Sequence, residues 1–165
     1  MDKSNLDLIS FPLERNCFGC SQTNPSGLQL NFYTEANSSK IYSFFIPSQE
    51  HVGWGNIIHG GIAATIMDEM SSWVVITNKK QMCVTLKLEL KYHGVLNTEA
   101  EYTVIGEIAA EKGRCVEVSS YICNAAGKKL VSAMAKMMVL SAEKAKSMNI
   151  MSDTELQAFN YFLNS

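Results

Sequence analysis

The sequence lacks the features that mark several specialised classes of protein. It has no dense run of lysine or arginine, and its formal net charge is only −2, from 14 basic and 16 acidic residues. Its first residues lack the long apolar core of a secretory signal, and no GxxxxGK phosphate-binding loop is present. The longest apolar stretch is short for a membrane span and contains two acidic residues. We therefore expect a cytoplasmic protein that binds neither nucleic acid nor a membrane.

The cysteines do not form a recognisable framework. Five is an odd number, and without a secretory context it favours reduced thiols. The Cys17-x-x-Cys20 pair has no second pair or nearby histidine to complete a zinc site, and Pro25 follows where a thioredoxin-like motif needs a helix. We expect Cys17 and Cys20 to be small buried residues of a compact loop, with no bound metal and no cofactor.

The length of 165 residues predicts a single domain, 1–165, large enough to bury a core without disulfides. Residues 1–27 have no clear periodicity, and 1–16 form an N-terminal extension ahead of a core at about 17–140. The sequence Ser-Asp-Thr-Glu at 152–155 is a capping box, which predicts a short C-terminal helix over 152–164.

Alternating apolar and polar residues predict the strands, over 28–34, 40–46, 83–92, 99–110, 114–124 and 128–140. In the segment 83–92, the alternation places Val84, Leu86, Leu88 and Leu90 on one buried face. The links between the last four strands are too short for parallel crossovers, so we expect an antiparallel meander.

The segment 61–78 predicts a long helix that is apolar on nearly every side. From Gly61 to Ile76, its only charged residues are Asp68 and Glu69. Such a helix must be covered nearly all round, which a curved antiparallel sheet wrapped around it achieves. The predicted fold class is therefore α+β, and its exposed sheet edge favours dimerisation.

The start of this helix suggests chemistry. The glycines of His59-Gly60-Gly61 present bare backbone N–H groups where the helix dipole favours negative charge. A carboxylate in an apolar helix is costly to bury, which makes Asp68 a candidate for catalysis. An oxyanion donor and a carboxylate on one helix indicate acyl transfer or hydrolysis.

Three sequence blocks resemble a known family. These blocks are CFGCSQTNPSGLQLNFY at 17–33, IIHGGIAATIMDEM at 57–70, and the strands at 84–92 and 113–139. Together they are similar to the hotdog-fold acyl-CoA thioesterases, in particular the phenylacetate-degradation type. One departure is that Tyr92 is followed by HGVLN, where many relatives place a proline. Because that loop can contact the acyl tail in the family, the sequence does not identify the acyl group of the substrate.

The resemblance implies roles for five residues around the glycine turn. Gly60 would donate the backbone N–H that polarises the thioester carbonyl, with Gly61 as the alternative donor. Asp68 would attack the carbonyl or activate a water as general base. Thr85 would help to hold the water or the aspartate, and His59 would either shape the turn through a ring hydrogen bond or act as a base. Each also has an ordinary structural explanation, such as a helix-entry turn or a buried acid bonded to Thr or Ser hydroxyls.

The resemblance also suggests residues that contact substrate. Asn56 could replace a polar residue that relatives often have six positions before the histidine, where this chain has Gly53. Glu69 could reach the same pocket, although a surface or interface ion pair is the stronger expectation. Arg114, with the neighbouring Lys112, could bind the phosphates of coenzyme A.

Helix geometry adds an independent argument. Gly60 and Asp68 are eight residues apart, so roughly 12 Å separates them along a helix. One carbonyl cannot contact both groups, so a shared site requires a second chain, in a homodimer or a dimer of dimers. The alternatives to a thioester hydrolase are a thioester-binding module without turnover and, less favoured, a dehydratase of hydroxyacyl thioesters.

Overall fold

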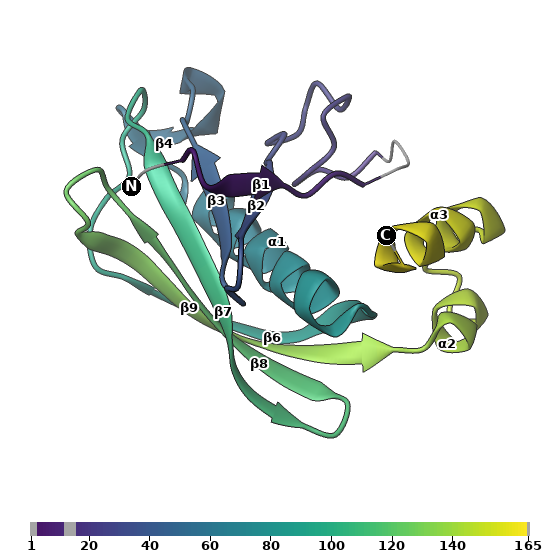
Figure 1. Cartoon of the computed structure of the whole chain (residues 1–165). Helices are drawn as coiled ribbons and strands as arrows, with labels where there is room; N and C mark the ends of the chain where they lie inside the picture. Colours follow the sequence, from purple (N-terminus) through teal and green to yellow (C-terminus); the bar gives the residue numbers. More distant parts are fainter. Residues whose placement is uncertain (1–2, 12–15, 165) are drawn as a thin grey trace.

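The computed structural model describes residues 3–11 and 16–164, and in it one antiparallel sheet wraps around one long helix (Figure 1). The predicted α+β class is confirmed. Before the helix, the chain forms β1 (Leu6–Leu8), β2 (Phe32–Glu35), β3 (Ile41–Phe45), a 3₁₀ turn (Gln49–His51), β4 (Val52–Trp54) and β5 (Ile57–Ile58). After helix α1 (Gly60–Lys79) come β6 (Met82–Tyr92), β7 (Tyr102–Lys112), β8 (Cys115–Cys123), β9 (Lys129–Leu140), α2 (Ala142–Ser147) and α3 (Asp153–Asn164).

Helix α1 is the centre of the core, as its composition predicts. His59 caps its start, and Lys80 ends it in a left-handed conformation with φ 52° and ψ 41°. Met67, Met70 and Val74 have no measurable solvent exposure. Gly106 on β7 allows the sheet to approach this helix closely, since a Cβ there would lie only 2.8 Å from side-chain atoms of Met70 and Val74. No helix in the described part of the chain is both long and apolar enough to cross a bilayer.

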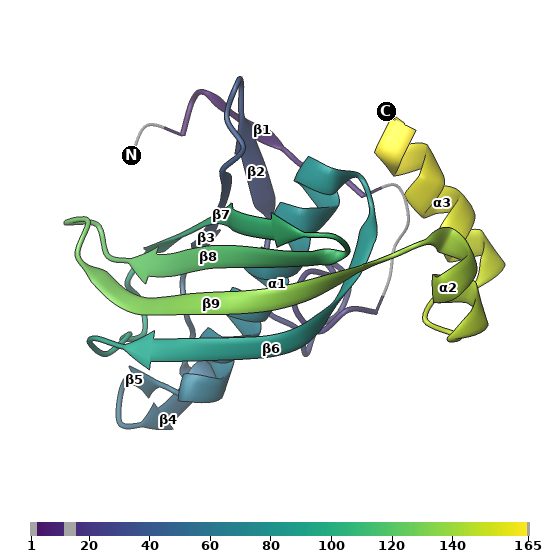
Figure 2. The same ribbon diagram turned by 90° about the horizontal axis from the view of Figure 1, so that it is seen from below.

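The strand order corrects one expectation. The main sheet runs β1-β2-β3-β7-β8-β9-β6, with antiparallel neighbours throughout (Figure 2). The expected four-strand meander is therefore wrong, because only β7, β8 and β9 follow one another. The link at 93–101 is long enough to carry the chain across the sheet, so β6 pairs with β9 and becomes an edge strand.

A β-bulge in β6 overturns the predicted alternation. The pairing with β9 shifts between Thr85 and Lys87, so Leu86 is an extra residue in the ladder. Before the bulge, Thr85 faces α1; after it, Leu88 and Leu90 pack against the core. Leu86 does not share their buried face and is 49% exposed. The inserted residue shifts the alternation of inward- and outward-facing side chains by one position. The apolar–polar pattern of the sequence does not reveal this shift.

The N-terminal segment contributes more structure than the sequence predicts. β1 pairs with β2, although no strand is expected before residue 28. The predicted strand over 28–34 begins only at Phe32. Its first half bonds instead to the cysteine loop, with the Leu28 N–H donating to the Phe18 carbonyl at 2.8 Å and the Leu30 N–H to that of Gly19 at 3.0 Å.

The predicted C-terminal helix is confirmed as α3. Its capping box is present, because the Ser152 N–H donates to the Glu155 carboxylate at 2.8 Å and the Glu155 N–H donates to Ser152 Oγ at 3.3 Å. Phe162 of α3 contacts the Trp73 ring edge-on, with ring centres 6.1 Å apart. The C-terminal segment thereby covers part of α1 that the sheet leaves open.

Candidate functional site

The first backbone N–H groups of α1 have no acceptor inside the helix. His59 caps the helix, and its Nδ1 accepts the Gly61 N–H at 2.9 Å. A Cβ on Gly61 would lie 2.9 Å from that nitrogen, so a side chain there would displace the capping ring. Because Gly61 is engaged with the cap, Gly60 is left as the N–H donor for a ligand, at the positive end of the helix.

A tyrosine from the edge strand lies against this turn. Tyr92 at the end of β6 donates its hydroxyl hydrogen to the Gly60 carbonyl at 2.8 Å. A Cβ on Gly60 would meet the Tyr92 hydroxyl at 3.4 Å, which is ordinary contact. Tyr92 therefore contacts the residue that carries the candidate donor, through the peptide that follows it, a contact that sequence reasoning did not identify.

Asp68 is held from the same strand. The Thr85 hydroxyl donates to Asp68 Oδ1 at 2.7 Å, in a partly exposed position. Thr65, three residues before Asp68 on the helix, instead donates to the Gly61 carbonyl at 3.0 Å. The bulge after Thr85 sits beside this contact, and such bulges often reorient side chains near functional sites. This hydrogen bond thus orients the aspartate through one of its two carboxylate oxygens.

Within one chain these two elements do not meet. Eight residues of helix separate Gly60 from Asp68, a rise of about 12 Å. Each group touches β6, Asp68 through Thr85 and Gly60 through Tyr92. Since β6 is an edge strand, both groups lie at the boundary where a second copy could add to the sheet.

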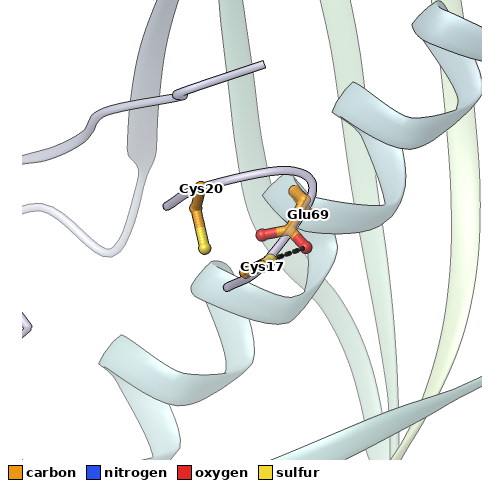
Figure 3. A group of neighbouring side chains, drawn as sticks. All are labelled: Cys17, Cys20 and Glu69. Carbon is orange, nitrogen blue, oxygen red and sulfur yellow. Dashed lines mark hydrogen bonds between the residues drawn. The ribbon is translucent and has the colours of Figure 1, made fainter. Parts of the chain in front are cut away.

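Glu69 points toward the N-terminal loop that carries Cys17 and Cys20 (Figure 3). A hydrogen bond of 3.3 Å joins Cys17 Sγ and Glu69 Oε1. A carboxylate oxygen of Glu69 and the sulfur atoms of Cys17 and Cys20 all lie within 4.8 Å of one another. The expectation of a surface ion pair is wrong, because the side chain is partly buried among thiols and no described basic residue of this chain pairs with it. The next helix position turns by about 100°, which separates the neighbouring carboxylates.

Burial and hydrogen bonding perturb the acid–base properties of this cluster. Burial, together with the nearby Cys17, raises the pKa of Glu69 to about 7. Hydrogen bonds from the Cys20 thiol and from the backbone N–H groups of Cys20 and Gly19 lower the pKa of Cys17 to about 5. The pKa of Cys20 is raised, because its proton is shared with Cys17 and because it is buried. The cluster therefore holds negative charge on Cys17 first.

The other predicted substrate contacts lie apart. Asn56 is exposed between β4 and β5, and its carbonyl accepts the Thr98 N–H at 3.0 Å. Arg114 is exposed in the β7–β8 hairpin. The Lys79–Glu111 ion pair, at 2.6 Å, ties that hairpin to the far end of α1, about 28 Å of helix from Gly60. Arg114 therefore cannot serve the Gly60 end of its own chain.

Comparison with known proteins identifies the fold. No family model and no curated protein sequence matches the chain. A crystal structure of a thioesterase superfamily protein has a TM-score of 0.69 at 18% identity, over 75% of this chain and 60% of that one. A hypothetical thioesterase of Streptococcus pneumoniae TIGR4, crystallised with coenzyme A, has a TM-score of 0.59 at 22% identity, over 62% and 79%. A Streptococcus mutans UA159 protein bound to acetyl-CoA has a TM-score of 0.62 at 15% identity, over 68% and 89%.

These similarities confirm the predicted hotdog fold, because a long antiparallel sheet around one central helix is common to all of them. The chain spans less than two thirds of the length of the first of these proteins. At such low identities the similarity establishes the fold, and the activity has to be argued from the site.

Proposed function

We propose that this protein is an acyl-CoA thioester hydrolase of the phenylacetate-degradation type. The observation that carries the proposal is Asp68, a carboxylate in an otherwise apolar helix that Thr85 orients at 2.7 Å. The three sequence blocks support the subtype, and the coenzyme A and acetyl-CoA bound to two proteins of this fold support the substrate class. The five free thiols favour a reducing compartment such as the cytoplasm.

In this reaction the Gly60 N–H would donate to the carbonyl oxygen of the thioester as negative charge develops there. Asp68 would either attack the carbonyl carbon and form an anhydride that water then hydrolyses, or remove a proton from an attacking water. In both routes the carbon–sulfur bond breaks, the thiolate leaves and is protonated, and a carboxylic acid is released. Only groups of the chain and water take part, without a cofactor.

The site would be shared between two chains. A two-fold axis crossing β6 midway between Thr85 and Tyr92 places Thr85 of one copy opposite Tyr92 of the other in an antiparallel pair. Because Thr85 holds Asp68 and Tyr92 holds Gly60, this symmetry brings the carboxylate of one copy toward the donor of its mate. It also brings Arg114 of one copy toward the Gly60 end of the other.

Two variants separate the two halves of this site. Gly60→Pro deletes the donor N–H, and proline suits the first helical position, where His59 already has the extended ψ of 133° that must precede a proline. Gly60→Ala is the matched control, because it keeps the N–H and its Cβ fits beside Tyr92. Asp68→Asn removes the carboxylate. We expect Gly60→Pro and Asp68→Asn each to lower kcat for acyl-CoA hydrolysis by about a hundredfold or more, and Gly60→Ala to retain it.

Co-expression of the two inactive variants tests the shared site. A mixed dimer contains one site with an intact Gly60 and an intact Asp68, so a random mixture should recover about a quarter of the wild-type activity. If activity is not recovered, either Gly60 and Asp68 of the same chain act together or neither group takes part in the reaction. Full activity of Asp68→Asn on a panel of CoA thioesters would overturn the hydrolase proposal. Binding without turnover in the wild type would indicate a binding module, and loss of water from a hydroxyacyl thioester a dehydratase.

A further inference from the structure

The two cysteines of the N-terminal loop and Glu69 of α1 form a compact group outside the hydrolytic site. Figure 3 shows the three side chains converging, two from one turn of the loop and one from the helix. Their ligand atoms all lie within 4.8 Å of one another, and Cys17 Sγ lies 3.3 Å from Glu69 Oε1. In a tetrahedral zinc site, Zn–S bonds of about 2.3 Å and Zn–O bonds of about 2.1 Å place a sulfur and an oxygen ligand about 3.6 Å apart. The observed spacing is close to that arrangement.

The loop that carries the cysteines is organised before any ligand binds. The Ser21 N–H donates to the Cys17 carbonyl at 3.3 Å and closes the turn. The Leu28 and Leu30 N–H groups donate to the carbonyls of the two residues between the cysteines. Hydrogen bonding from the backbone N–H groups of Cys20 and Gly19 also contributes to lowering the pKa of Cys17, which favours a thiolate ligand. The turn therefore holds both sulfurs in fixed positions.

Gly19 shows that the loop is fitted to the glutamate. A Cβ at this position would lie 2.2 Å from Glu69 Cγ and 2.4 Å from Cδ, so only a glycine lets the loop pack against that side chain. Within the described residues, no lysine, arginine or histidine forms an ion pair with Glu69. Two thiols and a carboxyl group thus share one partly buried place with no cationic side chain among the described residues paired to them, and a bound metal cation would favour their deprotonated forms as ligands.

We propose that Cys17, Cys20 and Glu69 bind a zinc ion that fastens the N-terminal loop to α1. Two thiolates select a soft divalent metal over Mg²⁺ or Ca²⁺, and the Cys-x-x-Cys spacing suits zinc. A cavity of about 220 Å³, lined in part by both cysteines and Trp73, can supply water as the fourth ligand. This site departs from the expectation of no metal, because the third ligand comes from a position 52 residues away in the sequence.

Cobalt substitution provides a direct test that does not depend on hydrolysis. Metal-free full-length protein, reduced and kept under anaerobic conditions, is titrated with Co²⁺ and then with Zn²⁺. We expect one Co²⁺ per chain, a sulfur-to-cobalt charge-transfer band, and the intense visible bands of a tetrahedral ion, all lost when Zn²⁺ displaces the cobalt. Bound Zn²⁺ should also protect Cys17 and Cys20 from iodoacetamide, as read by mass spectrometry, and raise the melting temperature.

Variants assign the ligands. Cys17→Ser and Cys20→Ser should each weaken metal binding at least about a hundredfold and lose most of the sulfur band, whereas Glu69→Gln should keep the band and weaken binding by about 10- to 100-fold. Cys115→Ser, on β8, is the control and should bind as the wild type does. Circular dichroism of each metal-free variant establishes that it is folded, and Glu69→Gln carries the test if a serine variant is not.

Three outcomes would overturn the proposal. The first is a folded, reduced wild type that shows no sulfur band with Co²⁺. The second is Co²⁺ binding that is unchanged in both Cys17→Ser and Glu69→Gln. The third is a Cys17–Cys20 disulfide that forms in air and is restored to dithiol without any metal uptake. None of these outcomes affects the proposed hydrolase, since Asp68 and Gly60 are not among the ligands.

Discussion

One ring nitrogen of His59 caps helix α1. Nδ1 accepts the Gly61 N–H, so the neutral ring carries its proton on Nε2 and its lone pair is used for the cap. This contact matches the turn-shaping role and leaves no basic nitrogen for the reaction unless the cap opens. The glycine turn was recognisable from the sequence because its residues contact one another within a few positions. The surroundings of Glu69 were not, because its partners Cys17 and Cys20 come from a distant part of the chain.

His59 substitutions distinguish a cap from a base. We expect His59→Ala to lower the free energy of unfolding by about 1 kcal/mol, because an alanine cannot accept the Gly61 N–H, and His59→Asn to restore most of that loss. Urea denaturation measures both, and an acyl-CoA hydrolysis assay follows each variant. His59→Asn should keep most of the activity. A stable His59→Asn protein that lost about a hundredfold in kcat would instead make the ring a general base.

At the scale of elements, composition predicts more than alternation does. The helix at 61–78 and the C-terminal helix follow from local signals, an apolar run with polar ends and a capping box, and both are confirmed. The order of strands and the bulge at Leu86 depend on which strands meet, so they were not predictable from the sequence. The bulge matters for function, because it turns Thr85 toward Asp68 while Leu88 and Leu90 still face the core.

The close contact between β7 and α1 gives a test of this packing. We expect Gly106→Ala to lower the free energy of unfolding by about 1–3 kcal/mol, since its Cβ would lie within 2.9 Å of Met70 and Val74 atoms. Ala109→Ser, exposed on the same strand, is the control and should change stability by less than about 0.5 kcal/mol. In a Val74→Ala background, Gly106→Ala should lower the free energy of unfolding by less than it does in the wild type, because the smaller side chain leaves room for the new Cβ. Additive costs would show that the helix moves away freely.

At the scale of the whole molecule, the two edge strands of the main sheet, as described, have different expected roles. β1 ends the sheet on one side and β6 on the other, and each carries an exposed leucine, Leu8 at 53% and Leu86 at 49%. Both residues that we place in the reaction are anchored on β6, and neither is anchored on β1. If β6 is the dimer edge, an apolar Leu86 is buried only after association, which accounts for a large apolar side chain on this surface.

Matched charge substitutions at the two edges test this assembly. We expect Leu86→Glu to leave the single chain folded, because the side chain is already half exposed, but to bring two unpaired carboxylates into each dimer. We expect this to weaken association by about 3 kcal/mol or more, which raises the dissociation constant of the dimer at least about a hundredfold. Light scattering after size exclusion should show a monomer, and hydrolysis should fall with the dimer fraction. Leu8→Glu should change neither. A monomeric Leu86→Glu protein with full activity would show that one chain holds a complete site, and the pairing of Asp68 with the mate's Gly60 would have to be given up.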